Sequence, residues 1–209
     1  MISGLYAVSN LDLLINNSGL SLKKAVRLIL AGGVKTLQLR EPMLSLREFY
    51  EIALFAVEAA HELEAKLLIN DRVDLMLAAG ADGVHLGWRS LPLKIVRKLV
   101  GPEKIIGVSA HSLRECLEAE AAGASYVTLG PVYATPSKYG ILDPLGLEVV
   151  REVVSKSKVP IVAIGGISPD RVAEVLECGV SGIAVMSGIM GADDVKAAAI
   201  SFSSRLTHN

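Results

Sequence analysis

The chain has 209 residues, 51% of them hydrophobic, and its 21 Lys and Arg residues balance 22 Asp and Glu residues. This length is enough for one sizeable core, so we expect residues 1–209 to form a single domain. The net charge of −1 excludes the basic field of a nucleic-acid-binding protein, and no apolar run reaches the roughly 18 residues that span a bilayer.

Short apolar or β-branched runs alternate with longer segments of helical periodicity along the chain. Segments 45–65 and 112–123 are typical of the helices, and Ser45, Ser112 and Ser168 stand at expected N-cap positions. Several helical segments end in glycine just before the next run. In chain order, the expected strands cover residues 4–9, 36–40, 66–71, 83–87, 105–110, 126–130, 160–165 and 182–187.

The expected strands show little alternation, which indicates burial on both faces and therefore a parallel sheet. Eight strand–helix units in a chain of 209 residues favour a closed barrel. A doubly wound open sheet is the alternative, and it usually carries a glycine-rich phosphate loop after its first strand. Here the first strand is followed by NLDLLINNSG. We therefore predict an α/β fold, a single (β/α)8 TIM barrel.

The N-terminal segment and the cysteines indicate the compartment. The first residues, MISGLYAVSNLD, lack the charged start and apolar stretch of a signal peptide. Cys116 and Cys178 have no metal-ligand spacing, so reduced thiols in a cytoplasmic protein are expected. The sequence predicts neither a nucleic acid nor a membrane as partner and leaves a homo-oligomer open.

Polar residues gather where the expected strands end. A TIM barrel carries its active site at this rim, so these residues indicate an enzyme or a ligand-binding protein. His85 is either a packed barrel histidine or a rim residue. Arg40 and Glu41 form a rim ion pair, or Glu41 holds a ligand or orients Arg40. The connection 134–144 is either a lid or a passive loop. The rim residues are Gln38, Arg40, Asn70, Asp71, Ser109, His111, Thr135, Ser137 and Lys138.

Glycines after the seventh and eighth strands predict an anion site. Gly165 and Gly166 let backbone N–H groups approach a ligand, and a helix beginning near Ser168 adds the positive end of its dipole. Met186 and Ser187 lead into a similar turn after the eighth strand. Barrels often hold phosphate between these two loops. The alternative is that the glycines only permit tight turns.

Six motifs in chain order carry a family resemblance. TLQLRE, LLINDRVDLMLAAGADGVHLG, GVSAHSL, YVTLGPVYATPSKYG, VAIGGI and GIAVMSGI resemble the thiamine phosphate synthase superfamily over essentially the whole chain. The superfamily has two branches, the synthases and the TenI-type proteins, which include thiazole tautomerases. The resemblance implies a protein of thiamine biosynthesis that binds a phosphorylated thiazole.

In the synthase branch, the resemblance implies that Mg²⁺ assists the coupling of an aminopyrimidine methyl pyrophosphate to a thiazole phosphate. Asp71 matches a metal carboxylate of that pattern. Two positions depart from it, because Pro42 replaces a pyrophosphate lysine and Ser90 replaces a second metal carboxylate. The synthase motifs match Arg40, Asn70, Ser109 and Lys138.

The departures resemble the TenI-type branch, as do RSLPL and GIAVMSGI. We therefore expect a thiazole tautomerase that transfers a proton without a metal or other cofactor. Tautomerase patterns carry a histidine where this chain has Pro131, so His111 is the expected acid/base group. The alternatives are the Mg²⁺-dependent synthase, with Asp71 as metal ligand, and a non-catalytic regulatory barrel that binds a thiamine-related phosphate. The expected catalytic residues are His111, Ser109 and Lys138, and the expected binding residues are Gln38, Arg40, Asn70, Thr135, Ser137, Gly165, Gly166, Met186 and Ser187.

Overall fold

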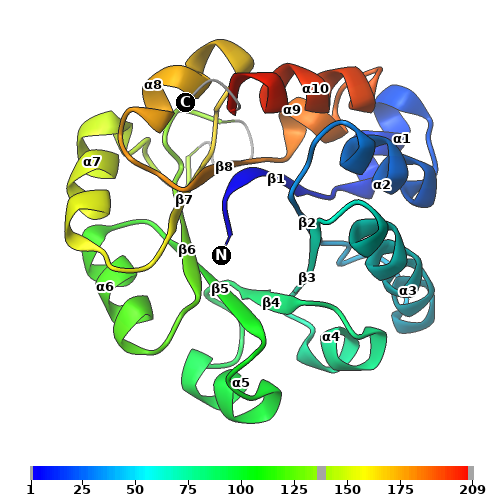
Figure 1. Cartoon of the computed structure of the whole chain (residues 1–209), viewed down its shortest axis with the longest axis horizontal. Helices are drawn as coiled ribbons and strands as arrows, with labels where there is room; N and C mark the ends of the chain where they lie inside the picture. Colours follow the sequence, from blue (N-terminus) through cyan, green and yellow to red (C-terminus); the bar gives the residue numbers. More distant parts are fainter. Residues whose placement is uncertain (1, 136–139, 207–209) are drawn as a thin grey trace.

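Eight parallel strands pair in chain order, and the last strand pairs with the first, which closes a barrel (Figure 1). The structure is a computed structural model that describes residues 2–135 and 140–206. This closure confirms the predicted (β/α)8 barrel and rules out the doubly wound sheet. The strands are β1 (Gly4–Val8), β2 (Thr36–Leu39), β3 (Lys66–Asn70), β4 (Gly83–Leu86), β5 (Ile105–Ala110), β6 (Tyr126–Leu129), β7 (Ile161–Ile164) and β8 (Gly182–Val185).

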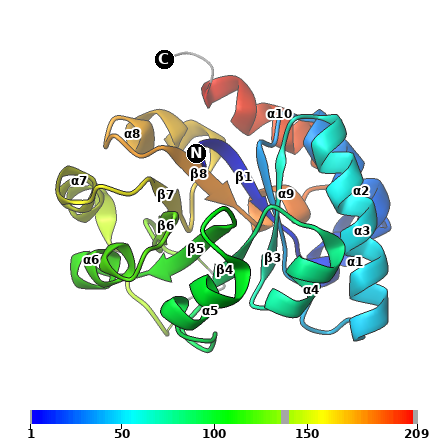
Figure 2. The same cartoon turned by 60° about the horizontal axis from the view of Figure 1, so that its bottom comes forward.

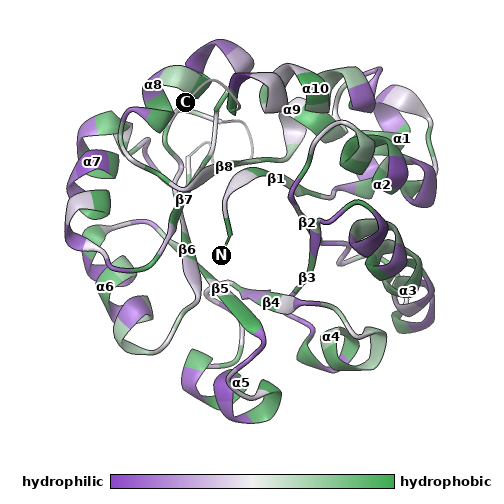
Figure 3. Cartoon of the chain, viewed as in Figure 1, coloured by the Kyte–Doolittle hydropathy of each residue, from purple (hydrophilic) through white to green (hydrophobic). Residues whose placement is uncertain are grey.

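Helices surround the barrel as an outer ring, as Figure 2 shows from a second direction. Hydrophilic and hydrophobic residues alternate along each of these helices (Figure 3). The helices are α1 (Leu11–Ser18), α2 (Leu22–Ala31), α3 (Leu46–Glu62), α4 (Val73–Ala79), α5 (Leu93–Val100), α6 (Leu113–Ala121), α7 (Gly146–Lys156), η2 (Pro169–Arg171), α8 (Val172–Leu176), α9 (Ser187–Met190) and α10 (Val195–Leu206).

Two of the three predicted serine caps are present. Ser45 accepts a hydrogen bond from the Glu48 amide, and the Glu48 side chain reaches back to form a capping box. Ser112 accepts from the Glu115 amide. Ser168 instead precedes the short η2 turn, where its side chain makes no capping bond within the described residues. The strong caps therefore start the helices that follow β2 and β5.

Two apolar layers fill the molecule. One lies between the strands and the helices, and a smaller one lies inside the barrel. Ile2, which is 3% exposed, belongs to the inner layer and precedes β1, so it closes the barrel at the amino ends of the strands. The inner layer consists of Ile2, Tyr6, Val8, Leu68, Tyr126, Val162 and Ala184.

Gly107 makes room for an aromatic ring inside the barrel. It pairs with Tyr126 across β5 and β6, and a Cβ atom built on Gly107 would lie 2.1 Å from Cζ of Tyr126. That distance is far below van der Waals contact, so only glycine at this position lets the Tyr126 phenol cross the lumen. Both lumen tyrosines, Tyr6 and Tyr126, are fully buried.

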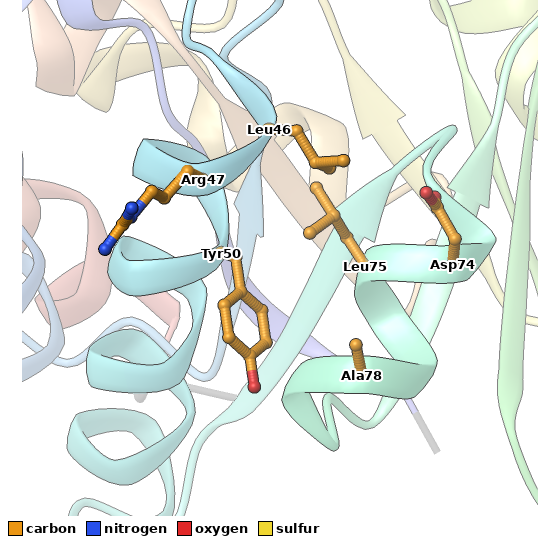
Figure 4. A pocket seen from close by; sticks show the side chains of 6 residues that line it. All are labelled: Leu46, Arg47, Tyr50, Asp74, Leu75 and Ala78. Carbon is orange, nitrogen blue, oxygen red and sulfur yellow. The ribbon is translucent and has the colours of Figure 1, made fainter.

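Two hollows lie in the outer wall, and the second of them reaches Asp71. One, of about 490 Å³, lies between the first turns of α3 and α4, and Figure 4 shows its side chains with the Arg47 guanidinium turned away from α4. Another, of about 450 Å³, is lined by residues of α4, α5 and the connection before each. In the part of the chain that the structure describes, no helix is both long and apolar enough to cross a membrane.

Candidate active site

The strand ends bring polar side chains together in the mouth of the barrel. Gln38, Asn70 and Ser109, all predicted from the sequence, take part in one connected set of hydrogen bonds. The set also includes His85, Tyr6 and Tyr126, which link the two sides of the lumen. Sequence reasoning missed both tyrosines, although each carries a hydroxyl group in a largely apolar strand.

Asp71 is held at the end of β3 by its neighbours. Gln38 Nε2 donates to Asn70 Oδ1 at 2.7 Å, and Asn70 Nδ2 donates to Asp71 Oδ2 at 2.7 Å. The Ser90 hydroxyl donates to the other Asp71 oxygen and accepts from the Gly87 amide. Asp71 also has a φ of 59°, a conformation that non-glycine residues adopt rarely and that often occurs at functional sites.

These groups fit a magnesium site with a single protein carboxylate. No cluster of three His, Cys, Asp or Glu side chains occurs among the described residues, so a metal cage built by the protein alone is absent from that part of the chain. Mg²⁺ commonly binds through one or two carboxylates together with waters and substrate phosphates. Asp71 is exposed at the rim and can supply one carboxylate, while Ser90 occupies the neighbouring position without a negative charge.

His85 is a buried, neutral histidine on β4, where it lies next to Asn70 in the register of β3 and β4. Burial lowers the pKa of His85 to about 4, so its ring carries one proton at neutral pH. Nδ1 lies 2.8 Å from the Tyr126 hydroxyl, and Nε2 lies 2.9 Å from the Ser109 hydroxyl. This agrees with the packed-histidine interpretation, although the partners of the ring are side chains rather than a backbone group.

His111 is anchored just outside β5. Its Nδ1 contacts the Gly130 carbonyl oxygen, and its backbone amide donates to Glu115 at 2.8 Å. Since a carbonyl oxygen only accepts, Nδ1 carries a proton in this contact. His111 is thus positioned beside the buried Pro131, which replaces the histidine of tautomerases with a residue unable to transfer protons.

Three carbonyl oxygens at the carboxyl end of β7 are turned toward the segment after β6 and toward η2. Ile164 O accepts from the Val132 amide at 2.9 Å, and Gly165 O accepts from the Tyr133 amide at 3.0 Å. Arg171 donates to Gly166 O at 3.0 Å. In a trans peptide the N–H group points opposite to the C=O group. The amides of Gly165 and Gly166 therefore point away from β6, on the side where β8 lies.

The two glycines also serve packing at this corner. Both have positive φ values, and added Cβ atoms would come within 2.6 Å of the segment that follows β6. Gly165 faces Pro131, and Gly166 faces the carbonyl oxygen of Ala134. The tight-turn interpretation is therefore part of their role, and it is compatible with the predicted anion site.

The predicted help from helix dipoles is wrong in part. Residues Pro169–Arg171 form a 3-10 turn and α8 has only 5 residues, while α9 after β8 has only 4. Helices this short sum few peptide dipoles, so individual amide groups are the donors that remain for an anion. Ser187 is exposed at the start of α9, next to Met186, whose sulfur lies 4.0 Å from Asn10 Nδ2.

Glu41 is buried just after β2 and does not form the expected ion pair. The residue is 5% exposed, and its Oε2 accepts from the Leu11 amide at 3.0 Å, so it holds the start of α1. Burial raises the pKa of Glu41 above its usual value. Arg40 is exposed after β2, and its backbone amide donates to Ser9 at 2.9 Å. The rim ion pair between Arg40 and Glu41 is therefore replaced by a link between β2 and α1.

Part of the predicted site lies outside the described residues. Ser137 and Lys138 belong to that segment, and Thr135 is the last described residue before it. Their proposed contacts with a phosphate stay predictions. The same holds for the interpretation of residues 134–144 as a lid.

Comparisons with known proteins identify the relatives of this barrel. The thiamine-phosphate synthase of Clostridium novyi is 44% identical over 181 residues, covering 87% of this chain and 89% of that protein. The synthase of Syntrophomonas wolfei is 44% identical over 192 residues, covering 92% and 90%. The solved thiamine phosphate pyrophosphorylase from Pyrococcus furiosus superposes with a TM-score of 0.88 at 38% identity, covering 97% of this chain and 95% of that one.

These relatives overturn the predicted tautomerase function and give no support to the TenI-type branch. The prediction gave too much weight to Ser90 and Pro42, although one carboxylate and the substrate phosphates are enough to hold Mg²⁺. Pro131 also lacks the proton-transfer group that a tautomerase needs. A family model described as thiamine monophosphate synthase matches residues 5–189. The chain belongs to the thiamine monophosphate synthase family.

Proposed function

We propose that this chain is a thiamine-phosphate synthase that couples an aminopyrimidine methyl pyrophosphate to a thiazole phosphate. The observation that carries the proposal is the fixed Asp71 carboxylate at the barrel mouth, in a chain 44% identical to named synthases over most of its length. The Asn70 and Ser90 side chains support it by holding both carboxylate oxygens in place.

The reaction requires one bond to break and one to form. The carbon–oxygen bond to pyrophosphate breaks, the leaving group keeps the electron pair, and the thiazole nitrogen donates its lone pair to the methylene carbon. Bound Mg²⁺ supplies positive charge that stabilises the leaving pyrophosphate. Asp71 would hold the ion, and the exposed Arg40 would add positive charge at the same rim.

The remaining residues of the mouth orient the substrates and exclude water. Gln38, Asn70 and Ser109 present polar groups above an apolar lumen, which suits a flat ring that carries a few polar atoms. The amides after β7, together with Ser187, would hold the thiazole phosphate. Closure of the lumen by apolar side chains protects a reactive carbon centre from water.

Incubation of the purified chain with both substrates and Mg²⁺ is expected to produce thiamine phosphate and pyrophosphate. EDTA should abolish turnover, and added Mg²⁺ should restore it, because the leaving group depends on the ion. Product formation is followed by chromatography and by a pyrophosphate assay. Absence of turnover despite measurable binding of the thiazole phosphate would contradict the proposal and favour the non-catalytic barrel.

Ser187→Asp is expected to weaken binding of the thiazole phosphate. Two negative charges about 4 Å apart near a protein surface repel by a few kcal/mol, which corresponds to a loss of about 10- to 100-fold in affinity. Calorimetry of the ligand with each protein measures this loss. Ser155→Asp is the matched control, because it adds the same charge on the exposed surface of α7. Equal affinities for both variants and the unchanged protein would show that the thiazole phosphate does not bind near Ser187.

A further inference from the structure

A chain of hydrogen bonds crosses the barrel lumen from Ser109 to Asp71. It runs through His85, Tyr126, Tyr6, Gln38 and Asn70, and every heavy-atom distance along it lies between 2.7 and 2.9 Å. His85, Tyr126, Tyr6 and Gln38 are each at most 4% exposed, so water does not compete for their bonds. The protons in this chain must therefore be shared among the side chains themselves.

The Asp71 end fixes the direction of the first two bonds of the chain. The Gly87 amide donates to Ser90, so the single Ser90 proton goes to Asp71, and an ionised carboxylate accepts at both oxygens. Asn70 must then turn its NH₂ group to Asp71 and its oxygen to Gln38. Gln38 in turn donates through Nε2 and leaves its own oxygen facing the lumen.

The same reasoning orders the remaining bonds, because each hydroxyl has one proton. Tyr6 donates to Gln38 Oε1, so it accepts from Tyr126. Tyr126 has then used its proton and accepts from His85 Nδ1. A neutral imidazole has only one N–H, so Nε2 is an acceptor and the Ser109 hydroxyl donates to it.

We propose that this one-way chain makes Tyr6 and Tyr126 positioning residues, which fix His85 as the Nδ1–H tautomer and turn the Ser109 proton inward. Toward a ligand, the Ser109 oxygen then acts only as a hydrogen-bond acceptor. Thr128, at 3.5 Å from both Ser109 Oγ and His85 Nε2, is too distant to compete for this order.

The chain orients groups and does not conduct protons. Passage of a proton from Ser109 to Asp71 would require the Gln38 and Asn70 amides to gain and lose protons, and neutral amides do neither at ordinary pH. Its effect is therefore electrostatic and geometric, because each buried polar atom is fixed as either a donor or an acceptor before a substrate binds.

The fixed orientation of the Ser109 hydroxyl has a consequence for substrate recognition, which rests on the proposed function. An acceptor oxygen at this position favours a ligand group that carries an N–H, such as a ring amino group. It disfavours a phosphate oxygen, which needs a donor.

The tautomer of His85 tests the proposal without substrate or activity. Long-range ¹H–¹⁵N spectra of the ¹⁵N-histidine-labelled full chain at neutral pH show which ring nitrogen carries the proton. A His85→Gln variant identifies the His85 signals among those of the 4 histidines. We expect Nδ1–H in the unchanged protein. An Nε2–H tautomer there would overturn the proposal, even if synthase activity is present.

Two variants test whether the tyrosines set the tautomer. Tyr126→Phe removes the acceptor of Nδ1–H, and Tyr6→Phe frees the Tyr126 proton to donate to Nδ1, so both should shift His85 to Nε2–H. Thr128→Val, beside His85, and Tyr50→Phe, on α3, should keep Nδ1–H. The same tautomer in all folded variants would show that the chain does not control His85, and would refute the positioning role.

Discussion

Replacing Asp71 by asparagine is expected to lower kcat/KM of the synthase reaction by about 10²- to 10³-fold, the loss typical of one removed group that stabilises transition-state charge. Asparagine keeps the shape of the side chain and removes its charge, so the expected Mg²⁺ ligand is lost while the fold is retained. Steady-state kinetics across a Mg²⁺ titration, with Mg²⁺ binding measured by calorimetry, give both effects.

The matched control for this variant is Asp74→Asn, three residues along the chain. Asp74 forms an exposed pair with Arg72, and such surface pairs contribute little. Kinetics should therefore be unchanged. Ser90→Asp, in contrast, adds a second carboxylate beside Asp71 and should lower the Mg²⁺ concentration needed for half-maximal activity. If Asp71→Asn retains full activity, or Ser90→Asp leaves the Mg²⁺ dependence unaltered, the metal ion is not held here.

Replacing Gly107 by alanine is expected to lower the free energy of unfolding by about 2–5 kcal/mol, through overpacking and the loss of buried hydrogen bonds. The new methyl group would lie 2.3 Å from the Tyr126 hydroxyl oxygen and would displace the ring. His85 and Tyr6 would then lose a buried partner. Urea denaturation followed by circular dichroism measures the change.

A double-mutant cycle separates this clash from any general intolerance of alanine in β5. In Tyr126→Leu the ring is absent, so adding Gly107→Ala should cost much less than it does in the unchanged protein. Gly87→Ala serves as a second control, because a Cβ atom there meets nothing within 4 Å. Equal costs of Gly107→Ala with and without the Tyr126 ring would refute the packing explanation.

The barrel could be predicted because its strands are short apolar runs separated by helical segments. The expected limits matched β5 and extended past the other strands by a residue or two, as at 66–71 against Lys66–Asn70. The reason is that the sequence shows no difference between the last strand residue and the first rim residue. The helices directly after β7 and β8 were harder to predict, because the 5 residues of α8 and the 4 of α9 are too few for a periodic pattern.

The candidate site was predictable where a polar residue stands at the carboxyl end of a strand and hidden where it lies deeper in the barrel. Asn70 is the last residue of β3 and Ser109 is the last but one of β5. Tyr6 and Tyr126, in contrast, are 120 positions apart and meet only when the barrel closes. Ser90 was interpreted only as a missing metal ligand. The structure shows that Ser90 also orients the remaining carboxylate, since its hydroxyl donates a hydrogen bond to Asp71.

Ile2 lies before β1 in the apolar layer that fills the barrel, so the amino ends of the strands are closed by packed side chains. In the proposed reaction, two substrates and two products would then all pass through the carboxyl-end mouth. The molecule that binds deeper would have to bind first and leave last. Steric access at one rim would thereby set the order of binding and release.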